Sequence, residues 1–554
     1  MNSKKNSPEK VEMQTLDKAQ TFISGLDDIL GGGIPRGRTT IILGEAGSGK
    51  TMLGLEFLYR GALAGEPGIF IGFEESIEQL RQNAATVGWD LPALEKEKKL
   101  FLLEGKINVD TVVSGDFSLK GLLAAISGKS RELGAKRVVI DALEVALRLF
   151  DEPKQVRKEI HLLNDWLQEC GLTAVMTVRP SQQRENFLFE DFFQSMGDCV
   201  IYLFTRVEAQ ISTRLLRVIK YRGSAFARNE YPFVINKKGI QVAPISTVEL
   251  RHQPLGDYMP TGINRLDEIL GGGYRRSACI LIAGTPGTGK TIMACSFIQK
   301  ACNRGEKVLY IGFEESREAV LRNILNAGVD LTPYAESNRL IFLTHFPEAM
   351  GAEEHFIQAM EKIDTFEVHH VVVDAISACE RMGGKQAAFE YLMRLLNACK
   401  EKGITIFLIN QTVDSARYTE LSGNGISSIV DTVISLMYHE EPGETNRLLQ
   451  IIKSRGSAHS NKKWEFLISD NCIEIVDVYI SEQLVLTTGT SRLVQKAHDQ
   501  AEAQRLAFEI ESKELELKRL RLLQEQFGPR KSAPDQKLYK TDSENHQEPH
   551  KPNQ

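Results

Sequence analysis

The chain has 554 residues, of which 42% are hydrophobic and 25% are charged, and its formal net charge is −6. A chain of this length exceeds a single hydrophobic core, so two or more domains are expected, and the composition is that of a soluble globular protein. The lack of a signal-peptide pattern, of a membrane-spanning apolar run and of overall basic charge argues against export, membrane insertion and general nucleic-acid binding, and favours a cytoplasmic protein. The eight cysteines form no CxxC pair and mostly lie in apolar runs, which predicts buried free thiols rather than disulfides or zinc ligands.

The N-terminal part of the chain leads into a phosphate-binding loop. Residues 1–18 are polar and rich in lysine and glutamate, which predicts a disordered segment. A short helix within 23–37, ended by glycines, precedes an apolar strand at 40–43. The next eight residues, 44–51, read GEAGSGKT and are followed by apolar residues at helical spacing. This strand–loop–helix context is the one that the phosphate-binding motif requires, although a single glycine-rich turn could match it by chance.

The residue types of this loop suit a nucleotide phosphate. Its glycines let backbone N–H groups curl around an anion at a helix N-terminus, its lysine supplies a positive charge, and its last threonine offers a hydroxyl to Mg²⁺. The candidate nucleotide-binding residues of the loop are Gly44, Gly47, Ser48, Gly49, Lys50 and Thr51.

Acidic residues follow two later strands. A buried strand at 67–73 ends at Glu74 and Glu75, where a water-activating carboxylate would lie beside the phosphate loop. A second strand ends at Asp141, in the pattern that positions Mg²⁺ through water. Many strands end in aspartate, so this second signal gains weight only because a phosphate loop precedes it.

The remaining elements predict a mainly parallel α/β sheet. The stretch from the end of the helix at 77–87 to about residue 120 looks less regular. The elements after it are a strand at 137–141, a helix at 153–169, strands at 172–178 and 199–204, and a basic strand at 214–224.

The whole unit then occurs a second time. The loop GTPGTGKT begins at Gly284, which is 240 residues after Gly44, and Glu314 follows Glu74 by the same 240 residues. Asp374 follows its counterpart by 233 residues. Chance matches would not share this register, so the duplication supports both sites more strongly than either motif alone. The second set of candidates is Gly284, Gly287, Thr288, Gly289, Lys290 and Thr291 for the nucleotide, Thr291 and Asp374 for Mg²⁺, and Glu314 and Glu315 for catalysis.

The motif order resembles the KaiC family of RecA/DnaB-like ATPases and autokinases of the bacterial circadian clock. The resemblance rests on LDDILGGG at 26–33, the phosphate loop, and GFEES at 72–76, all duplicated, and it covers residues 19 to about 490. It implies two tandem RecA-like P-loop ATPase domains, at 19–245 and 255–490. It also implies a homohexamer of two stacked rings that holds ATP and Mg²⁺ between neighbouring subunits. Glu74, Glu75, Glu314 and Glu315 match the catalytic pairs of the family.

The resemblance adds residues that face a neighbouring subunit's nucleotide. An arginine from a neighbouring subunit would stabilise charge on the transferring phosphoryl group. The alternative is that these basic residues only form a solvated strand. Thr86 matches a polar position near the base, and Ala327 replaces an aromatic residue in the second copy. The further nucleotide-binding candidates are Lys220, Arg222, Ser224, Arg447, Lys453, Arg455, Ser457 and His459.

The stretch 425–432 resembles the phosphorylated segment of the family. Ser427 and Ser428 fall on the two acceptor positions, and Ser422 falls on a nearby hydroxyl position. The alternative is that these serines cap a helix or form a turn. The matching stretch of the first copy, 193–198, lacks paired hydroxyls, so the first ring is expected to hydrolyse ATP only.

The resemblance ends after Thr490. No counterpart of the tail that the activator KaiA engages is present, which argues against a KaiA-type partner, while a KaiB-type regulator remains open. Residues 500–527 form an amphipathic pattern that favours a coiled coil over a solitary surface helix, and 528–554 form a polar tail expected to be disordered. One heptad position holds Ala503, Ile510, Leu517 and Gln524, and the other holds Leu506, Lys513, Leu520 and Phe527.

These observations lead to one main hypothesis and two alternatives. The chain is expected to be a homohexameric ATPase that autophosphorylates on serine or threonine in its second ring and acts in circadian or other timing signals. The helix at 500–527 would join two hexamers into a dodecamer. The alternatives are a RecA/DnaB-like motor acting on DNA, against which the acidic charge argues, and a nucleotide-gated scaffold with little turnover.

Overall fold

The computed structural model describes most of the chain in two compact units, 1–477 and 478–554. The predicted disordered segments fall outside the described residues, except for 16–18, and so do Ser427 and Ser428. The prediction for Lys18 is wrong, because this residue begins a short strand that pairs with a second strand at Ile34–Pro35. The described residues are 16–105, 119–148, 150, 152–180, 193–243, 253–412, 426, 429–441, 444–460, 462–469, 472–476, 479–481, 484–486 and 488–527.

The first unit contains two nine-stranded mixed sheets of the same design. In the first sheet six strands are parallel, in the order β8, β3, β7, β6, β4 and β5, and three antiparallel strands continue it beyond β8. The strands are β3 (Thr39–Gly44), β4 (Gly68–Gly72), β5 (Leu100–Glu104), β6 (Arg137–Asp141), β7 (Thr173–Val178), β8 (Cys199–Glu208), β9 (Ile211–Tyr221), β10 (Glu230–Asn236) and β11 (Gly239–Val242).

The helices of this first domain pack on both faces of the sheet. Ile42 of β3 packs on one side in the same cluster as α2, whereas Ile41 packs on the other side in the same cluster as α8. Burial on both faces explains why the parallel strands read as continuous apolar runs. The helices are α1 (Leu26–Leu30), α2 (Lys50–Leu63), α3 (Ile77–Thr86), α4 (Leu91–Lys96), α6 (Leu119–Leu133), α7 (Leu143–Leu147) and α8 (Pro153–Glu169).

The second sheet repeats this order, with β14 in the place of β3. Its strands are β14 (Cys279–Gly284), β15 (Val308–Gly312), β16 (Leu340–Thr344), β17 (His370–Asp374), β18 (Thr405–Gln411), β19 (Thr432–Glu441), β20 (Glu444–Ser454), β21 (Lys463–Ser469) and β22 (Cys472–Val476). The helices around it are α10 (Asn264–Ile269), α11 (Lys290–Asn303), α12 (Arg317–Leu325), α13 (Thr332–Glu336), α14 (Ala352–Phe366) and α15 (Lys385–Glu401), with the 3₁₀ helices η2 (Pro347–Ala349) and η3 (Ile376–Met382). The predicted α/β class with mainly parallel sheets is confirmed.

The strand that carries the predicted aspartate is held at its opposite end by buried polar contacts. Arg137, at the start of β6, is 1% exposed and donates hydrogen bonds to Glu66 at 2.6 Å and to the carbonyl oxygen of Phe57 at 2.9 Å. In the second domain His370 begins β17 and lies 2.9 Å from Glu306. Burial alone would raise the pKa of Glu306, but hydrogen bonds from His370 and two arginines hold it well below its ordinary range. The position of each strand-end aspartate therefore depends on a charged network at the other end of its strand.

One sequence prediction needs correction, and the prediction for the cysteines is confirmed with one exception. The stretch from 88 to about 120 is not irregular in its described part, because it forms α4 and β5, which are short elements without a strong periodicity. The cysteines whose side chains the structure describes are free thiols, and Cys170, which follows the last residue of α8, is the exposed one among them. The others are buried, and they are Cys199, Cys279, Cys295, Cys302, Cys379 and Cys399.

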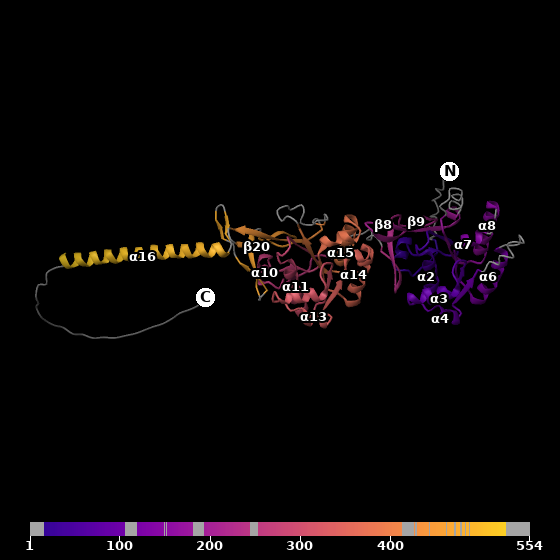
Figure 1. The fold of residues 1–554 in the computed structure, drawn as a ribbon, viewed down its shortest axis with the longest axis horizontal. Helices are drawn as coiled ribbons and strands as arrows, with labels where there is room; N and C mark the ends of the chain where they lie inside the picture. The colour runs from indigo at the N-terminus through magenta and orange to yellow at the C-terminus, as the bar shows by residue number, and fades with distance from the viewer. Residues whose placement is uncertain are drawn as a thin grey trace, which may run out of the picture. The chain divides into compact units, whose positions relative to one another are not determined.

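The second unit consists of a hairpin and one long helix. β23 (Tyr479–Ser481) pairs with β24 (Leu484–Leu486), and α16 runs over Thr488–Phe527, drawn as one continuous helix in Figure 1. The helix thus begins 12 residues before the predicted start at 500, because the apolar heptad positions that reveal it in the sequence begin only at Ala503. Among the described residues, no helix is both long and apolar enough to span a membrane.

Candidate functional site

Each predicted phosphate loop joins the central parallel strand of its sheet to the following helix. β3 ends at Gly44 and α2 begins at Lys50, and β14 and α11 are joined by the matching loop. Gly47 and Gly49 have φ angles of 75° and 97°, a region that L side chains rarely adopt. A Cβ atom at Gly44 would lie only 2.6 Å from the carbonyl oxygen of Leu203. The motif therefore needs glycine at these positions for its backbone shape, which leaves the loop N–H groups to line a small concavity suited to an anion.

The loop lysines fold back over their own loops. The Nζ atom of Lys50 donates to the carbonyl oxygen of Glu45 at 2.8 Å, and Lys290 makes the same contact with Thr285 at 2.8 Å. Burial lowers the pKa of both amines. A bound anion would favour the charged form of each lysine, so these contacts fit a phosphate group in the loop.

A hydrogen bond links each loop threonine to the aspartate predicted with it. Thr51 Oγ1 lies 3.0 Å from Asp141 Oδ2, and Thr291 Oγ1 lies 2.8 Å from Asp374 Oδ2. Burial raises the pKa of both aspartates, whereas the hydroxyl donors lower it. Hydroxyl and carboxylate oxygens are the ligand types that Mg²⁺ prefers, together with phosphate and water. Among the described residues, no group of three or more histidine, cysteine or acidic side chains is arranged to hold a metal ion, so a metal ion here would take further ligands from phosphate and water.

The two glutamates of each acidic pair have different surroundings. Glu75 accepts a hydrogen bond from Asn83 on α3 at 3.2 Å, and Glu315 accepts one from Asn323 on α12 at 3.0 Å. The first glutamate of each pair interacts electrostatically with the loop lysine, and Glu74 also forms an ion pair with Arg179 at 3.0 Å. Glu74 and Glu314 are therefore the better candidates for a catalytic base, a distinction that the sequence alone does not make.

The predicted basic residues lie away from their own phosphate loops. Lys220 pairs in register with Val200 near the start of β8, which lies beside the start of β3 rather than its loop end. Lys220 donates to the carbonyl oxygens of Gln194 and Ser195 at 2.7 and 2.9 Å, and Arg222 also donates to Ser195 at 2.7 Å.

The second domain has the same arrangement. Lys453 donates to the carbonyl oxygen of Val430 at 2.6 Å, and Arg455 lies 3.6 Å from Asp431. Arg447 is the exception, because its Nε atom donates to the carbonyl oxygen of Gly287 in its own loop at 3.4 Å.

The other predicted nucleotide contacts lie outside the loops. Thr86 ends α3 and donates to the carbonyl oxygen of Asn83 at 2.7 Å. Ser224 accepts a hydrogen bond from Lys18 at 2.7 Å, and Ser457 lies 2.5 Å from Ser454. None of these contacts brings the side chain to a phosphate loop of the same chain.

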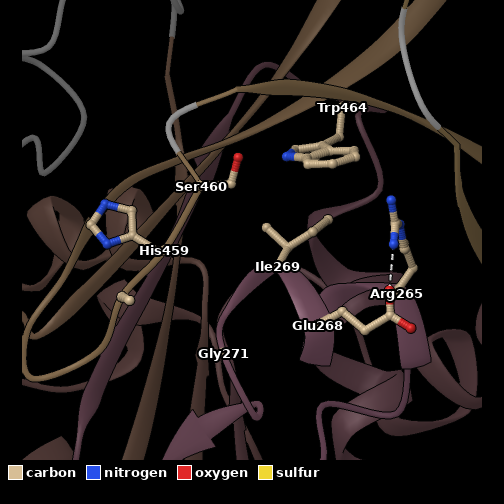
Figure 2. Close-up of a pocket in the computed structure, with 8 residues that line it drawn as sticks. Arg265, Glu268, Ile269, Gly271, His459, Ser460 and Trp464 are labelled. Carbon is tan, nitrogen blue, oxygen red and sulfur yellow. Dashed lines mark hydrogen bonds and ion pairs between the residues drawn. The ribbon is translucent and has the colours of Figure 1, made fainter.

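His459 lines an open cavity of about 400 Å³ beside α10 (Figure 2). Arg265 and Trp464 lie across the cavity from it, with the guanidinium 5.1 Å from the centre of the indole ring. The matching place in the first domain is occupied by Phe226 and Ala227, which pack against the core. The residues that line this cavity include none of the loop residues.

The two domains orient their aspartates with different hydroxyl groups, which the sequence analysis missed. In the first domain Thr177 of β7 donates to Asp141 Oδ1 at 2.6 Å. In the second domain Tyr310 of β15 donates to Asp374 Oδ2 at 2.7 Å. Strand register shows that Ile409 takes the position of the threonine in the second domain. Only the comparison of these two positions across the repeat could have revealed the exchange.

Comparison with known proteins gives a consistent family. A family model described as "ATPase: KaiC" matches residues 19–247 and 259–479. The chain is 38% identical over 511 residues to "Circadian clock protein KaiC2" of Synechocystis sp., covering 91% of this chain and 89% of that protein. It is 32% identical to "Circadian clock oscillator protein KaiC" of Synechococcus elongatus over 484 residues, covering 87% and 93% of the two chains. The protein with the same description from Thermosynechococcus vestitus is also 32% identical, over 493 residues and 88% and 94% of the chains.

Removing the phenol of Tyr310 tests its role beside Asp374. In Tyr310→Phe the pKa of Asp374 should rise further above its ordinary value, because burial would be opposed by one hydrogen bond fewer. Any ATP hydrolysis that needs the ionised carboxylate should then fall off at a pH about 1 unit higher on the acid side. The measurement is the pH profile of hydrolysis in a Lys50→Ala background, which reports the second domain.

A matched control and a rescue accompany this prediction. Tyr391→Phe removes another buried phenol, one without a hydrogen-bond partner among the described residues, and it should leave the profile unchanged. Adding Ile409→Thr to Tyr310→Phe should restore the original profile. An unchanged acid limb in Tyr310→Phe would contradict the assigned role.

Proposed function

Because the chain belongs to the KaiC family of ATPases, we propose that it binds ATP at both phosphate loops and hydrolyses it there. The observation that carries this proposal is the convergence, in each domain, of a loop lysine, a threonine–aspartate hydrogen bond and a strand-end glutamate. Domains at 19–245 and 255–490 would each provide one complete set of these groups from a single chain.

The proposed chemistry assigns one role to each group. Lys50 and Lys290 neutralise phosphate charge, and the loop N–H groups hold the phosphates at the helix N-terminus. Mg²⁺, when bound between the threonine and the aspartate, would neutralise developing charge on the phosphate oxygens. Glu74 and Glu314 accept a proton from the attacking group in their own domain.

The position of the basic residues supports a homohexamer. Lys220 and Arg222 lie at the opposite end of the central strand from their own loop, so in this proposal they meet a phosphate bound by another subunit. Lys453 and Arg455 have the same placement in the second domain. Cations supplied in this way would make turnover depend on assembly, with ATP held between neighbours.

The flanks of the proposed acceptor serines support phosphorylation by a neighbouring subunit. Ile426 and Val430, on either side of Ser427 and Ser428, are fully buried in the core of the second domain. The following strand, β19, begins beside Ile280, near the start of β14 and away from the loop at its end. The described residues that flank the serines therefore lie near the end of the domain that carries Lys453, where a neighbour's nucleotide would lie. A role in circadian or other timing signals is proposed from the described functions of the relatives.

The exposed faces of α16 support a role in assembly. Every described side chain from 503 to 523 is exposed. Leu506, Ile510, Leu517 and Leu520 form the predicted seam, each more than half exposed. Phe508, Leu515 and Leu522 recur every seven residues and form a second apolar line, about 140–160° from the position of Ile510 and Leu517. We propose that the seam pairs with helices of a second hexamer, which gives a dodecamer.

Hydrolysis at each site can be tested by removing one carboxylate at a time. Glu74→Gln should lower phosphate release from the first domain by about 100-fold or more in a Lys290→Ala background, because glutamine cannot accept the proton. Glu75→Gln is the matched control, and it should have a much smaller effect because Glu75 is bonded to Asn83. Equal losses in the two variants would contradict the assignment of the base. Stimulation of hydrolysis by single-stranded DNA would favour the alternative of a DNA-acting motor.

If the second domain autophosphorylates, the transferred phosphate should be found on one peptide. After incubation with Mg-ATP, phosphopeptide mapping should find phosphate on Ser427 or Ser428, and Glu314→Gln should abolish it. Ser422→Ala is the control and should keep the label. Phosphate at other positions only, or none after long incubation, would remove the autokinase from the proposal.

If the apolar seam of α16 joins two hexamers, substitutions in the seam should lower the mass of the assembly. Light scattering in ATP should give a dodecamer for the full chain and a hexamer for Ile510→Glu/Leu517→Glu, because two charges would enter each apolar seam. A charge change at the exposed Glu511 is the control and should keep the dodecamer. A single hexamer for the unmodified chain would exclude the helix as a joint between rings.

A further inference from the structure

Arg179 holds the candidate base of the first domain in an ion pair. Its Nη2 atom lies 3.0 Å from one oxygen of Glu74 and 3.5 Å from the other. Arg179 directly follows β7, which runs between β3 and β6. Because these three strands are parallel, the arginine lies at their carboxyl ends, as do the phosphate loop and Asp141.

A second carboxylate lies behind this arginine. Glu144 follows Asp141 by three residues, is 8% exposed, and accepts a hydrogen bond from the backbone N–H of Arg179. One oxygen of Glu144 and the Nε atom of Arg179 are buried without a partner among the described residues. Arg179, Glu144 and Glu74 all interact electrostatically with Lys50. The edge of the first loop therefore holds two cations and unsatisfied hydrogen-bonding groups, which indicates a site built for an additional ligand group.

The second domain serves as an internal comparison. Strand register aligns Val178 with Asn410, so Gln411 takes the position of Arg179. Ser377 takes the position of Glu144, three residues after Asp374. Within the described residues, Glu314 has no ion pair or hydrogen bond of the kind that Glu74 makes. Arg179 and Glu144 are thus specific to the first domain, whereas Glu74 has a counterpart in Glu314.

The ion pair between Arg179 and Glu74 can be replaced by another interaction of Arg179 with little loss of stability. The side chain of Arg179 is 37% exposed and that of Glu74 is 52% exposed, and pairs at such positions contribute little to stability. A terminal phosphate offers two or three oxygens to the planar guanidinium and lies in the field of Lys50 as well. The phosphate is therefore the stronger partner for Arg179. When the arginine turns to it, Glu74 loses its counter-charge and is free to bond a water molecule.

We propose that Arg179 is a positioning residue that senses the γ-phosphate in the first domain: it holds Glu74 when the site is empty or contains ADP, and releases it when ATP binds. This inference rests on the proposed function, because it requires ATP in the first loop. It adds that the two domains distinguish ATP from ADP by different means. Only the first site couples that distinction to its own base.

The test measures ATP and ADP affinity separately with fluorescent analogues of each, on the full chain in a Lys290→Ala background. Arg179→Gln, which introduces the residue of the second domain, should weaken ATP binding by about tenfold or more and change ADP binding less than about twofold. Retained ADP binding also shows that the variant is folded. Equal weakening for both nucleotides, or none for either, would overturn the proposal.

Two further variants sharpen the result. Arg179→Lys keeps the charge and should prefer ATP more strongly than Arg179→Gln, whereas the same preference in both variants would argue against a charge-dependent sensor. Gln411→Ala in a Lys50→Ala background is the matched control, and it should leave the ATP-to-ADP ratio of the second site unchanged. If the first site still binds nucleotide after Lys50→Ala is added to Lys290→Ala, the proposed function fails as well. If that binding is lost while Arg179→Gln has no effect, only the present inference fails.

Discussion

The hydrogen bond between the loop threonine and the strand-end aspartate is the contact on which the rest of the site depends. It forms at 3.0 Å between Thr51 and Asp141 and at 2.8 Å between Thr291 and Asp374. These residues are far apart in the sequence and meet only because β3, β7 and β6 are adjacent and parallel. The same strand order brings the end of β4, with Glu74, to this edge. A sheet with another order would keep every motif and lose the site.

The charged network at the start of β6 has an equivalent in the second domain and keeps the aspartate strand in place. Removing one partner of such a contact destabilises a protein, because the group that remains loses its hydrogen-bond or charge partner. Arg137 of the first domain contacts Glu66, which precedes the neighbouring strand β4. His370 of the second domain contacts Glu306, which precedes the neighbouring strand β15 in the same way. The arrangement is thus retained while the side chain that completes it differs. The exchange of Thr177 for Tyr310 at the other end of the strand follows the same principle.

Local motifs made much of this molecule predictable, and long-range contacts account for the rest. The predicted helix at 153–169 and the strand at 137–141 agree with the structure, because each has a strong pattern of its own. The roles of Glu74 and Glu75 could not be separated, since their difference depends on Asn83 and on the loop lysine. Arg179 belongs to no sequence motif. Its proposed role follows only from the strands that lie beside β7 in the sheet. The sequence pattern likewise placed the start of α16 too late, because its first turns lack the apolar heptad positions.

The central claim is that both loops are working nucleotide sites within one chain, and the count of bound nucleotide tests it most directly. Equilibrium binding of a non-hydrolysable ATP analogue with Mg²⁺ should saturate at two molecules per chain, one for each loop. Lys50→Ala and Lys290→Ala should each leave one molecule bound at saturation. Saturation at one molecule in the unmodified chain, or a count that neither lysine substitution changes, would contradict the account.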